Sequence, residues 1–560
     1  MQKRPLSRLG ISAGLALALL AGCGEQKQSR DTLVIGMTQY PATLNPNIES
    51  MLAKTYVLAM TRRPFTHHDT NWKLICALCE TLPTLENGLA VPEILANGKQ
   101  GVAVTYTIKQ GATWGDGTPV TTKDVLFTLE VGRHPASGFA DSEFYRRTLK
   151  IDVKDARTFT LHLDRLTFDY NAINSFRLLP AHIERDNFKD PKEYRLRTAY
   201  DTDSTNPGLY FGPYRITGKE TGSRIVLEAN PTWWGKKPYF KKIVVQIIEK
   251  TAALEANLLS GSINYIAGEL GLLLDQGLAF EKRHGKDFNI EFKPSLVYEH
   301  LDLNLENPIL KDLRVRRALI LAIDRATITE KLFDGRQPVA NSFVNPLDWV
   351  YSKETPSYRH DPARANQLLD DAGWAKRDAK GFRVNAAGKR LTFELMTTAG
   401  SRSRELVQQV LQSQWRQVGI DIRIRNEPAR VYFGETVTKR KFKAFAMFAW
   451  LSAPESVPRL TLHSKHIPTA ANNWSGQNYT SYKNPEIDKL LDATELELDR
   501  EKRRVLWAKL QKIYAQDLPV IPLFFRADPF IIPKWLKGIR PTGHQDPTTL
   551  WVEHWRAEQP

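Results

Sequence analysis

Hydrophobic and polar residues alternate along much of the first half of the chain. Val104, Tyr106 and Ile108 are separated by threonines, and this period of two predicts a strand with one buried face. Residues 149–153 and 159–163 alternate in the same way on either side of a short polar turn, which predicts a hairpin. The first half is therefore expected to be rich in β-structure.

The second half changes period. The apolar positions of residues 361–373 fall on one helical face, at Ala365, Leu368, Leu369 and Ala372. Next come an alternating strand at 391–395, a helical pattern at 406–418 and another strand at 420–424. A strand, helix and strand within this length form a βαβ unit, so this half is expected to contain a parallel sheet.

Length and composition bound the architecture. The 560 residues exceed what one hydrophobic core supports, so two or three lobes are expected. With 42% hydrophobic and 25% charged residues, the composition is that of a folded globular protein. The chain has 13 Trp residues, which fit either apolar ligand walls or a large core.

The start of the chain predicts export. Lys3, Arg4 and Arg8 precede an apolar stretch at 9–21, which is too short to span a bilayer but fits a signal peptide. The stretch ends in Leu-Ala-Gly-Cys23, which resembles the bacterial lipobox. We therefore expect residues 1–23 to be a lipoprotein signal that ends at a lipidated Cys23. The alternative is a plain secretory signal with a chance cysteine.

The formal charge of +16 falls to about +13 once the basic residues of the signal peptide are removed. The basic residues are dispersed, and Glu501 interrupts even the densest group, at 500–504. This pattern favours a solvated basic surface over a nucleic-acid patch.

The remaining cysteines, Cys76 and Cys79, are predicted to form a local disulfide, because an exported chain enters an oxidising compartment. A metal site that also uses His67 and His68 is the alternative. The two histidines are adjacent and lack the usual spacer of zinc sites, so we expect no metal.

Motifs for enzymatic chemistry are missing. The sequence contains no Gly-x-Ser-x-Gly elbow, no His-Glu zinc motif and no phosphate-binding glycine loop. Two carboxylates can meet from anywhere in a chain, so a hydrolase that uses such a pair stays open. We expect a protein that is not an enzyme and that uses no cofactor.

Several segments, in order, resemble one family of bacterial proteins. The fullest match is 105–125, with its strand, its glycine turn, its Trp-Gly-Asp-Gly-Thr-Pro turn and a helix start at Asp124, which we expect to cap that helix. Further matches are 206–214, 230–238, 312–325, 361–374 and 518–523. Together they resemble the family 5 solute-binding proteins, the dipeptide-, oligopeptide- and nickel-binding class of ABC importers.

The resemblance implies an α/β fold of the periplasmic-binding-protein type II, cluster C, in which a two-lobed clamp carries an extra β-rich domain. After the signal and a tether at 24–30, lobe I would comprise 31–60, 205–298 and 521–560. The extra domain would be 61–204 and lobe II 299–520. Chain crossings near Leu301 and Leu518 would form the hinge.

The resemblance also implies ligand-binding positions. Thr38, Gln39 and Tyr40 match a segment that runs beside the ligand in the family. Trp450 matches a pocket-wall tryptophan, although a core tryptophan is an alternative. Ser452 follows it, and Trp474 lies in a polar and aromatic segment that is either a further wall or an ordered loop.

One departure from the family concerns the ligand. Peptide binders of the family hold the ligand ammonium with an Asp shortly after the tryptophan, where this chain has Ala453. Either Glu455 supplies the carboxylate or the ligand lacks a free ammonium there. We expect weak binding of simple free-amine peptides and a preference for modified, blocked or non-peptide solutes, with a slight preference for anionic ones.

The resemblance implies a substrate-binding lipoprotein that captures a peptide or peptide-like solute by closing its lobes. Its partners would be an ABC permease and ATPase, with a bacterial membrane as the support of its lipid anchor. We expect a monomer in the periplasm or cell envelope that does not bind nucleic acid. The alternative is an envelope sensor lipoprotein that uses the same clamp.

Overall fold

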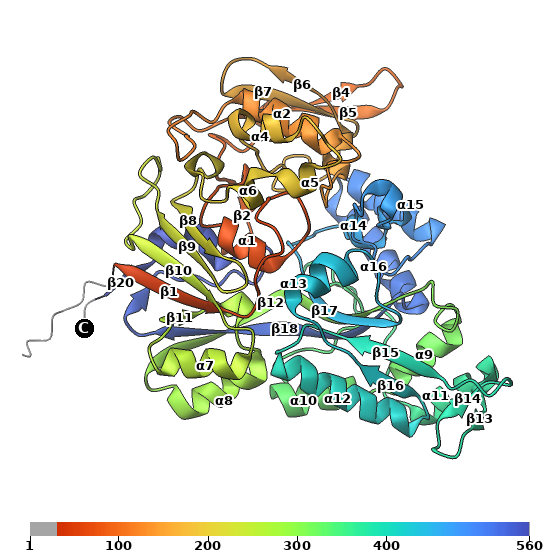
Figure 1. The fold of residues 1–560 in the computed structure, drawn as a ribbon. Coiled ribbons are helices and arrows are strands. Elements are labelled where there is room, and N and C mark those ends of the chain that lie inside the picture. The colour runs from red at the N-terminus through yellow and green to blue at the C-terminus, as the bar shows by residue number, and fades with distance from the viewer. Residues whose placement is uncertain (1–30, 559–560) are drawn as a thin grey trace, which may run out of the picture.

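The computed structural model describes residues 31–558, so the predicted signal, the tether and Cys23 lie outside the described residues. The first of three large sheets has the strand order β11-β1-β10-β9-β8. Its strands are β1 Thr32–Met37, β8 Tyr214–Glu220, β9 Arg224–Ala229, β10 Lys242–Ile247 and β11 Tyr265–Ile266. β1 lies parallel to both β10 and β11, with α7 (Thr251–Leu259) and α8 (Leu274–His284) beside the sheet (Figure 1).

The second sheet is antiparallel and forms the β-rich part of the molecule, at the top of Figure 1. Its order is β4-β5-β7-β6, with β4 Ala90–Ile94, β5 Gln100–Thr107, β6 Thr148–Val153 and β7 Thr158–Leu163. Ile151 faces Leu161 across the β6–β7 pair, which confirms the predicted hairpin. The helix α2 (Thr122–Arg133) packs against α3 (Glu143–Arg147) and α4 (Ala181–Asn187) at this sheet.

The third sheet has the order β16-β15-β17-β12-β18. β15 (Thr392–Met396), α12 (Arg402–Gln417) and β16 (Asp421–Ile424) form the predicted βαβ unit, since β15 and β16 are parallel. β17 (Phe445–Leu451) lies parallel to β15 and antiparallel to β12.

Two long strands connect the N-terminal part of the molecule to the third sheet. β12 (Phe288–Leu303) and β18 (Val520–Pro533) run antiparallel along almost their whole length. One end of this pair lies beside α8, and the other end of β12 pairs with β17, so the pair crosses the molecule (Figure 1). The predicted domain boundaries and the hinge role of these crossings stay predictions.

The remaining helices and strands complete the fold. The helices are α1 Leu52–Leu58, α3 Glu143–Arg147, α4 Ala181–Asn187, α5 Tyr194–Arg197, α6 Ala199–Thr202, α9 Leu313–Leu321, α10 Arg325–Phe333, α11 Pro362–Leu369, α13 Ala429–Val431, α14 Arg459–Leu462, α15 Pro485–Leu496 and α16 Arg500–Asp517. The strands are β2 Thr66–His68, β3 Leu74–Cys76, β13 Lys376–Arg377, β14 Arg383–Val384, β19 Leu536–Lys537 and β20 Arg556–Ala557. Within residues 31–558, no helix is long and apolar enough to cross a membrane.

The helix caps explain why several motifs of the sequence lie where they do. Asp312, Asp324 and Asp361 accept backbone N–H groups at the starts of α9, α10 and α11. The prediction that Asp124 caps α2 is wrong, because Thr121 occupies the cap position. Asp124 stands three residues later, and its carboxylate accepts the Thr121 N–H at 2.9 Å, which completes a capping box.

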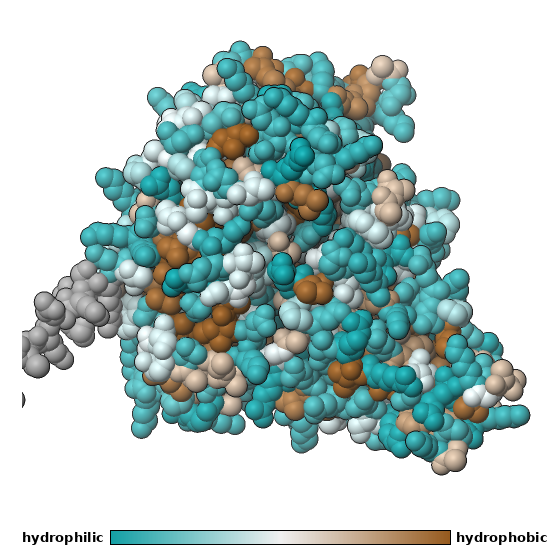
Figure 2. Space-filling view, in the orientation of Figure 1, coloured by the Kyte–Doolittle hydropathy of each residue, from teal (hydrophilic) through white to brown (hydrophobic). Residues whose placement is uncertain are grey.

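The surface in Figure 2 is mainly hydrophilic, and its apolar residues gather in small separate groups. Such small groups are ordinary on a protein surface and need no partner.

Candidate ligand-binding site

A cavity of about 700 Å³ lies where the three parts of the molecule meet. Its lining includes Thr38 and Gln39 after β1, Phe144 and Arg177 from the β-rich part, and Trp450 on β17. A cavity of this size that collects side chains from distant segments is the form that small-molecule sites take.

Thr38 and Gln39 reach the cavity because β1 ends just before them. Ligands of sheets with parallel strands bind beyond the carboxyl ends of those strands, and β1 is parallel to both of its neighbours. Thr38 is fixed there, since its N–H and its hydroxyl donate to the Leu270 carbonyl at 2.9 and 2.7 Å. Tyr40 is a correction to the predicted site: it is buried in the core of the N-terminal part and does not line the cavity.

Trp450 forms an aromatic wall of the cavity. It pairs with Tyr298 across β12 and β17, and its ring stacks on Tyr479 at 5.8 Å between centroids. Phe448 meets the Trp450 ring edge-on at 5.3 Å. Trp450 is only half-buried and lines the cavity, so the structure favours the wall over the core alternative.

The loop after β17 carries Ser452, Ala453 and Glu455, all of which line the cavity. The Glu455 carboxylate forms an ion pair with Arg503 of α16 and accepts the Trp349 Nε1–H at 3.0 Å. Both carboxylate oxygens of Glu455 therefore already have partners from the protein.

Trp474 is the second correction to the predicted site, because it does not line the cavity. Its neighbours bind the β-rich part of the molecule instead. The Asn473 side-chain amide donates to the Ala136 carbonyl at 3.0 Å, and the Ser475 hydroxyl donates to the Phe139 carbonyl at 3.0 Å. The segment 473–475 is thus a contact between the two sides of the cavity.

Charged residues that no motif marked also line the cavity. Arg404 on α12 forms an ion pair with Glu299 on β12 at 2.7 Å. Burial alone would raise the pKa of Glu299, but Arg404 and Arg526 hold it below its usual value. Arg62, Arg177 and Asp546 line a different part of the cavity. They come from three distant segments, so no local sequence signal indicated them.

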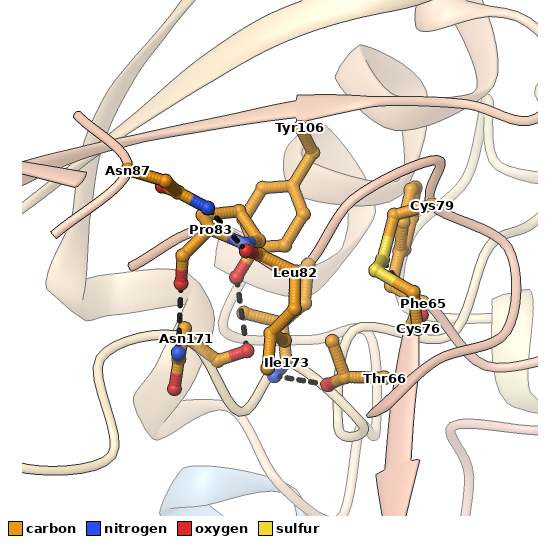
Figure 3. The surroundings of a disulfide bond; sticks show 10 residues. All are labelled: Phe65, Thr66, Cys76, Cys79, Leu82, Pro83, Asn87, Tyr106, Asn171 and Ile173. Carbon is orange, nitrogen blue, oxygen red and sulfur yellow. Dashed lines mark hydrogen bonds between the residues drawn. A yellow bond between two sulfur atoms is a disulfide. The ribbon is translucent and has the colours of Figure 1, made fainter. Parts of the chain in front are cut away.

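Cys76 and Cys79 form a disulfide at the end of β3 (Figure 3), and neither residue lines the cavity. Their Cα atoms lie 5.2 Å apart, and Phe65 lies beside the bridge. No group of three or more His, Cys, Asp or Glu side chains in the described chain is arranged to hold a metal ion.

Solved structures share this fold. The oligopeptide-binding protein of Thermus thermophilus, complexed with a pentapeptide, superposes with a TM-score of 0.86 at 28% identity, over 94% of this chain and 96% of that one. The oligopeptide-binding protein AppA of Bacillus subtilis, in complex with a nonapeptide, gives a TM-score of 0.82 at 25% identity, over 94% and 99% of the chains. The molecule has the type II periplasmic-binding-protein fold, as expected.

Sequence comparison places the chain within this class. AppA of Bacillus subtilis (strain 168) is 26% identical over 96% of this chain and 97% of its own length. The family model for bacterial extracellular solute-binding proteins, family 5 Middle, matches residues 86–467. The chain belongs to the family 5 bacterial extracellular solute-binding proteins, which confirms the resemblance noted in the sequence.

Proposed function

We propose that this protein is the substrate-binding component of an ABC importer for a peptide or peptide-like solute. The observation that carries the proposal is the cavity of about 700 Å³, which receives side chains from all three parts of the molecule. The relatives named above are oligopeptide-binding proteins that have been crystallised with peptides of five and nine residues. The solute is handed to the permease, which the ATPase drives.

Capture proceeds by closure of the two lobes about β12 and β18. These strands are the long connections between the N-terminal part and the third sheet, so bending them changes the width of the cavity. Contacts such as Asn473 with Ala136 then hold the two sides together over the bound solute.

The solute is one without a free ammonium beside Trp450. Ala453 supplies no carboxylate, and the Glu455 carboxylate already has Arg503 and Trp349 as partners. A buried ammonium without a carboxylate partner is costly, so modified, amino-blocked or non-peptide solutes fit this region better than simple free-amine peptides.

Lipidation of Cys23 tethers the protein to a bacterial membrane within the cell envelope, where a monomer meets its permease. The lipobox supports this part of the proposal. The sensor alternative has no observation in its favour.

The test starts from protein purified from bacterial membranes. Mass spectrometry of the solute released on denaturation identifies the ligand, and calorimetry with that solute measures its affinity. Trp450→Ala should weaken binding by about 10-fold or more, because stacking area is lost, whereas Trp450→Phe should keep most of it. Absence of any retained solute, together with no binding of peptides of five to nine residues, would refute the proposal, as would chemical turnover of the solute.

A further inference from the structure

One arginine of the cavity wall, Arg62, forms no ion pair with any described residue. Arg62 follows α1 and lines the cavity, yet its Nε and Nη1 atoms are buried without a hydrogen-bond acceptor in this part of the chain. The adjacent Arg63 differs, because it donates to Glu553 at 2.6 Å and to the Ala59 carbonyl at 2.8 Å. A buried guanidinium normally has a carboxylate or carbonyl partner. Arg63 has both, whereas the buried Nε and Nη1 atoms of Arg62 have neither.

Two further cations surround Arg62 and increase the need for an anion. Arg177 also lines the cavity and donates to the Pro46 carbonyl at 3.0 Å. Lys54 donates to the carbonyls of Asn45 and Glu49 at 2.9 and 2.6 Å. Burial and the neighbouring Arg177 lower the pKa of Arg62 to about 9 and lower that of Lys54 well below its usual value.

The nearby carboxylates leave the buried donors of Arg62 unpaired. Glu49 forms an ion pair with Arg195, and Asp141 accepts a hydrogen bond from Ser175. Asp546 attracts Arg62 and Arg177, but it accepts the His68 N–H at 3.0 Å and makes no ion pair with either arginine. Asp201 attracts Lys54, but it accepts the Leu44 N–H at 2.9 Å and a hydrogen bond from the Thr43 hydroxyl. Within residues 31–558, none of these carboxylates accepts a hydrogen bond from the buried Nε and Nη1 atoms of Arg62.

We infer that Arg62 is an anion subsite of the cavity and binds a carboxylate of the captured solute. A guanidinium offers N–H groups in a planar fork that matches a carboxylate, so a solute carboxylate would satisfy the donors that the protein leaves unpaired. The inference rests on the proposed function, because it assigns a chemical feature to the solute that the cavity captures. The carboxylate belongs either to an acidic side chain or to the end of a peptide.

Peptide probes test the subsite. The first set consists of pentapeptides that are acetylated at the N-terminus and amidated at the C-terminus and that carry one Glu at each of the five positions in turn. The second set is identical except that Gln replaces the Glu. The third set consists of the Gln peptides with a free C-terminal carboxylate in place of the amide. In calorimetry with the native protein, at least one acidic probe should bind about 10-fold or more tighter than its neutral counterpart. The tighter set identifies the source of the carboxylate.

Variants assign the preference to Arg62. In Arg62→Gln the acidic probe should lose its advantage to within about 2-fold, while the neutral probe keeps its affinity. Arg62→Lys keeps the positive charge but loses the planar guanidinium. Its preference for the acidic probe should therefore lie between that of the native protein and that of Arg62→Gln. Arg185→Gln is the matched control, because Arg185 is exposed on α4 and pairs with Glu130 far from the cavity lining. It should leave both affinities unchanged.

The unfolding midpoint of the ligand-free protein separates a binding arginine from a structural one. Removal of an unpaired buried cation should leave the midpoint of Arg62→Gln unchanged or higher. A lower midpoint with an intact acidic preference would overturn the subsite. Equal binding of acidic and neutral probes by the native protein would also overturn it and leave the proposed capture function standing. If no probe of any set binds, the peptide-capture function fails together with the subsite.

Discussion

At the residue scale, we expect Ala453 to determine whether the cavity accepts a free amino group. Ala453 lines the cavity after β17, where peptide binders that the sequence resembles carry an Asp. We expect Ala453→Asp to raise the affinity for free-amine tripeptides by about 10-fold or more relative to their acetylated forms, because it adds a charged partner for the ammonium. Calorimetry with both forms checks this, and Ala453→Asn provides a control of the same shape without the charge.

Binding through Glu455 would contradict the prediction that the cavity lacks a partner for a ligand ammonium. If the native protein binds free-amine tripeptides at micromolar affinity and Glu455→Gln abolishes that binding, Glu455 supplies the anchor. Glu455 would then have to exchange its contacts with Arg503 and Trp349 for the ligand.

A second residue-scale prediction concerns Glu269 and pH. Its carboxylate accepts the Thr548 N–H at 2.7 Å, and burial raises its pKa from 4.5 to about 7. A raised pKa means that the folded state favours the protonated form of Glu269. The stability that protonation of Glu269 adds to the folded state is therefore fully present below pH 4.5 and is lost as the pH rises through 7. Glu269→Gln is neutral at every pH and should be about 1–3 kcal/mol more stable than the native protein at pH 8 but not at pH 5.

Calorimetric unfolding at the two pH values measures this difference, with the exposed Glu130→Gln as a control for a general charge effect. A Glu269→Gln variant that is less stable than the native protein at pH 8 would show that the ionised carboxylate is the stabilising form.

At the element scale, the turn after β3 is closed by the Cys76–Cys79 disulfide. Because the bridge closes a very short loop, chain entropy assigns it only about 2 kcal/mol of stability. We expect the double variant Cys76→Ser/Cys79→Ser to lose that amount in chemical denaturation. In protein from the envelope, alkylation under denaturing conditions should find neither thiol free before reduction. Two free thiols, or zinc in equal amount to protein, would refute the disulfide.

Local elements could be predicted from the sequence because local periodicity determines them. The hairpin of β6 and β7 and the unit β15–α12–β16 follow from alternation and helical spacing within about 35 residues. The cap of α2 was misassigned because Thr121 and Asp124 both fit a cap by residue type. Only the backbone geometry shows which of them precedes the first turn.

The cavity could be predicted only in part, because it is assembled by long-range packing. Trp450 and Gln39 were found through the resemblance, and both line the cavity. Arg62, Arg177 and Asp546 meet there from segments more than 100 residues apart, and an isolated arginine in a sequence gives no sign of being unpaired. Tyr40 follows the lining residue Gln39 in the sequence but is buried in the core. Trp474 lies between Asn473 and Ser475, which bind the β-rich part and do not line the cavity.

At the scale of the whole molecule, we expect the proposed lipid anchor to determine where the protein works. Cys23→Ser should move the protein from the membrane fraction to the soluble envelope fraction without unfolding it, because the proposed lipid is bonded to the Cys23 thiol. Fractionation in high salt measures this, because salt removes proteins that are held by charge alone. Retention of Cys23→Ser in washed membranes would refute lipidation as the anchor.

The contacts of Asn473 and Ser475 test whether closure retains the solute. Their side chains bind the carbonyls of Ala136 and Phe139 on the opposite side of the cavity, and neither residue lines the cavity. A variant that changes both therefore acts on closure without touching the ligand. The Ser475 hydroxyl also forms a hydrogen bond with the Ser142 hydroxyl at 3.0 Å. Asn473 has a φ of +50°, so Asn473→Gly combined with Ser475→Ala removes these three hydrogen bonds without straining the backbone.

We expect this double variant to release its solute about 5- to 30-fold faster, because the hydrogen bonds across the cavity are lost, with little change in the association rate. Stopped-flow fluorescence, or surface plasmon resonance with the identified solute, measures both rates. Ser260→Ala serves as the control, because Ser260 lies in an exposed turn after α7 and bonds only within that turn. An unchanged dissociation rate would mean that β12 and β18 hold the closed form without the contacts of Asn473 and Ser475. A lower affinity caused by slower association would mean that segment 473–475 shapes entry to the cavity rather than retention of the solute.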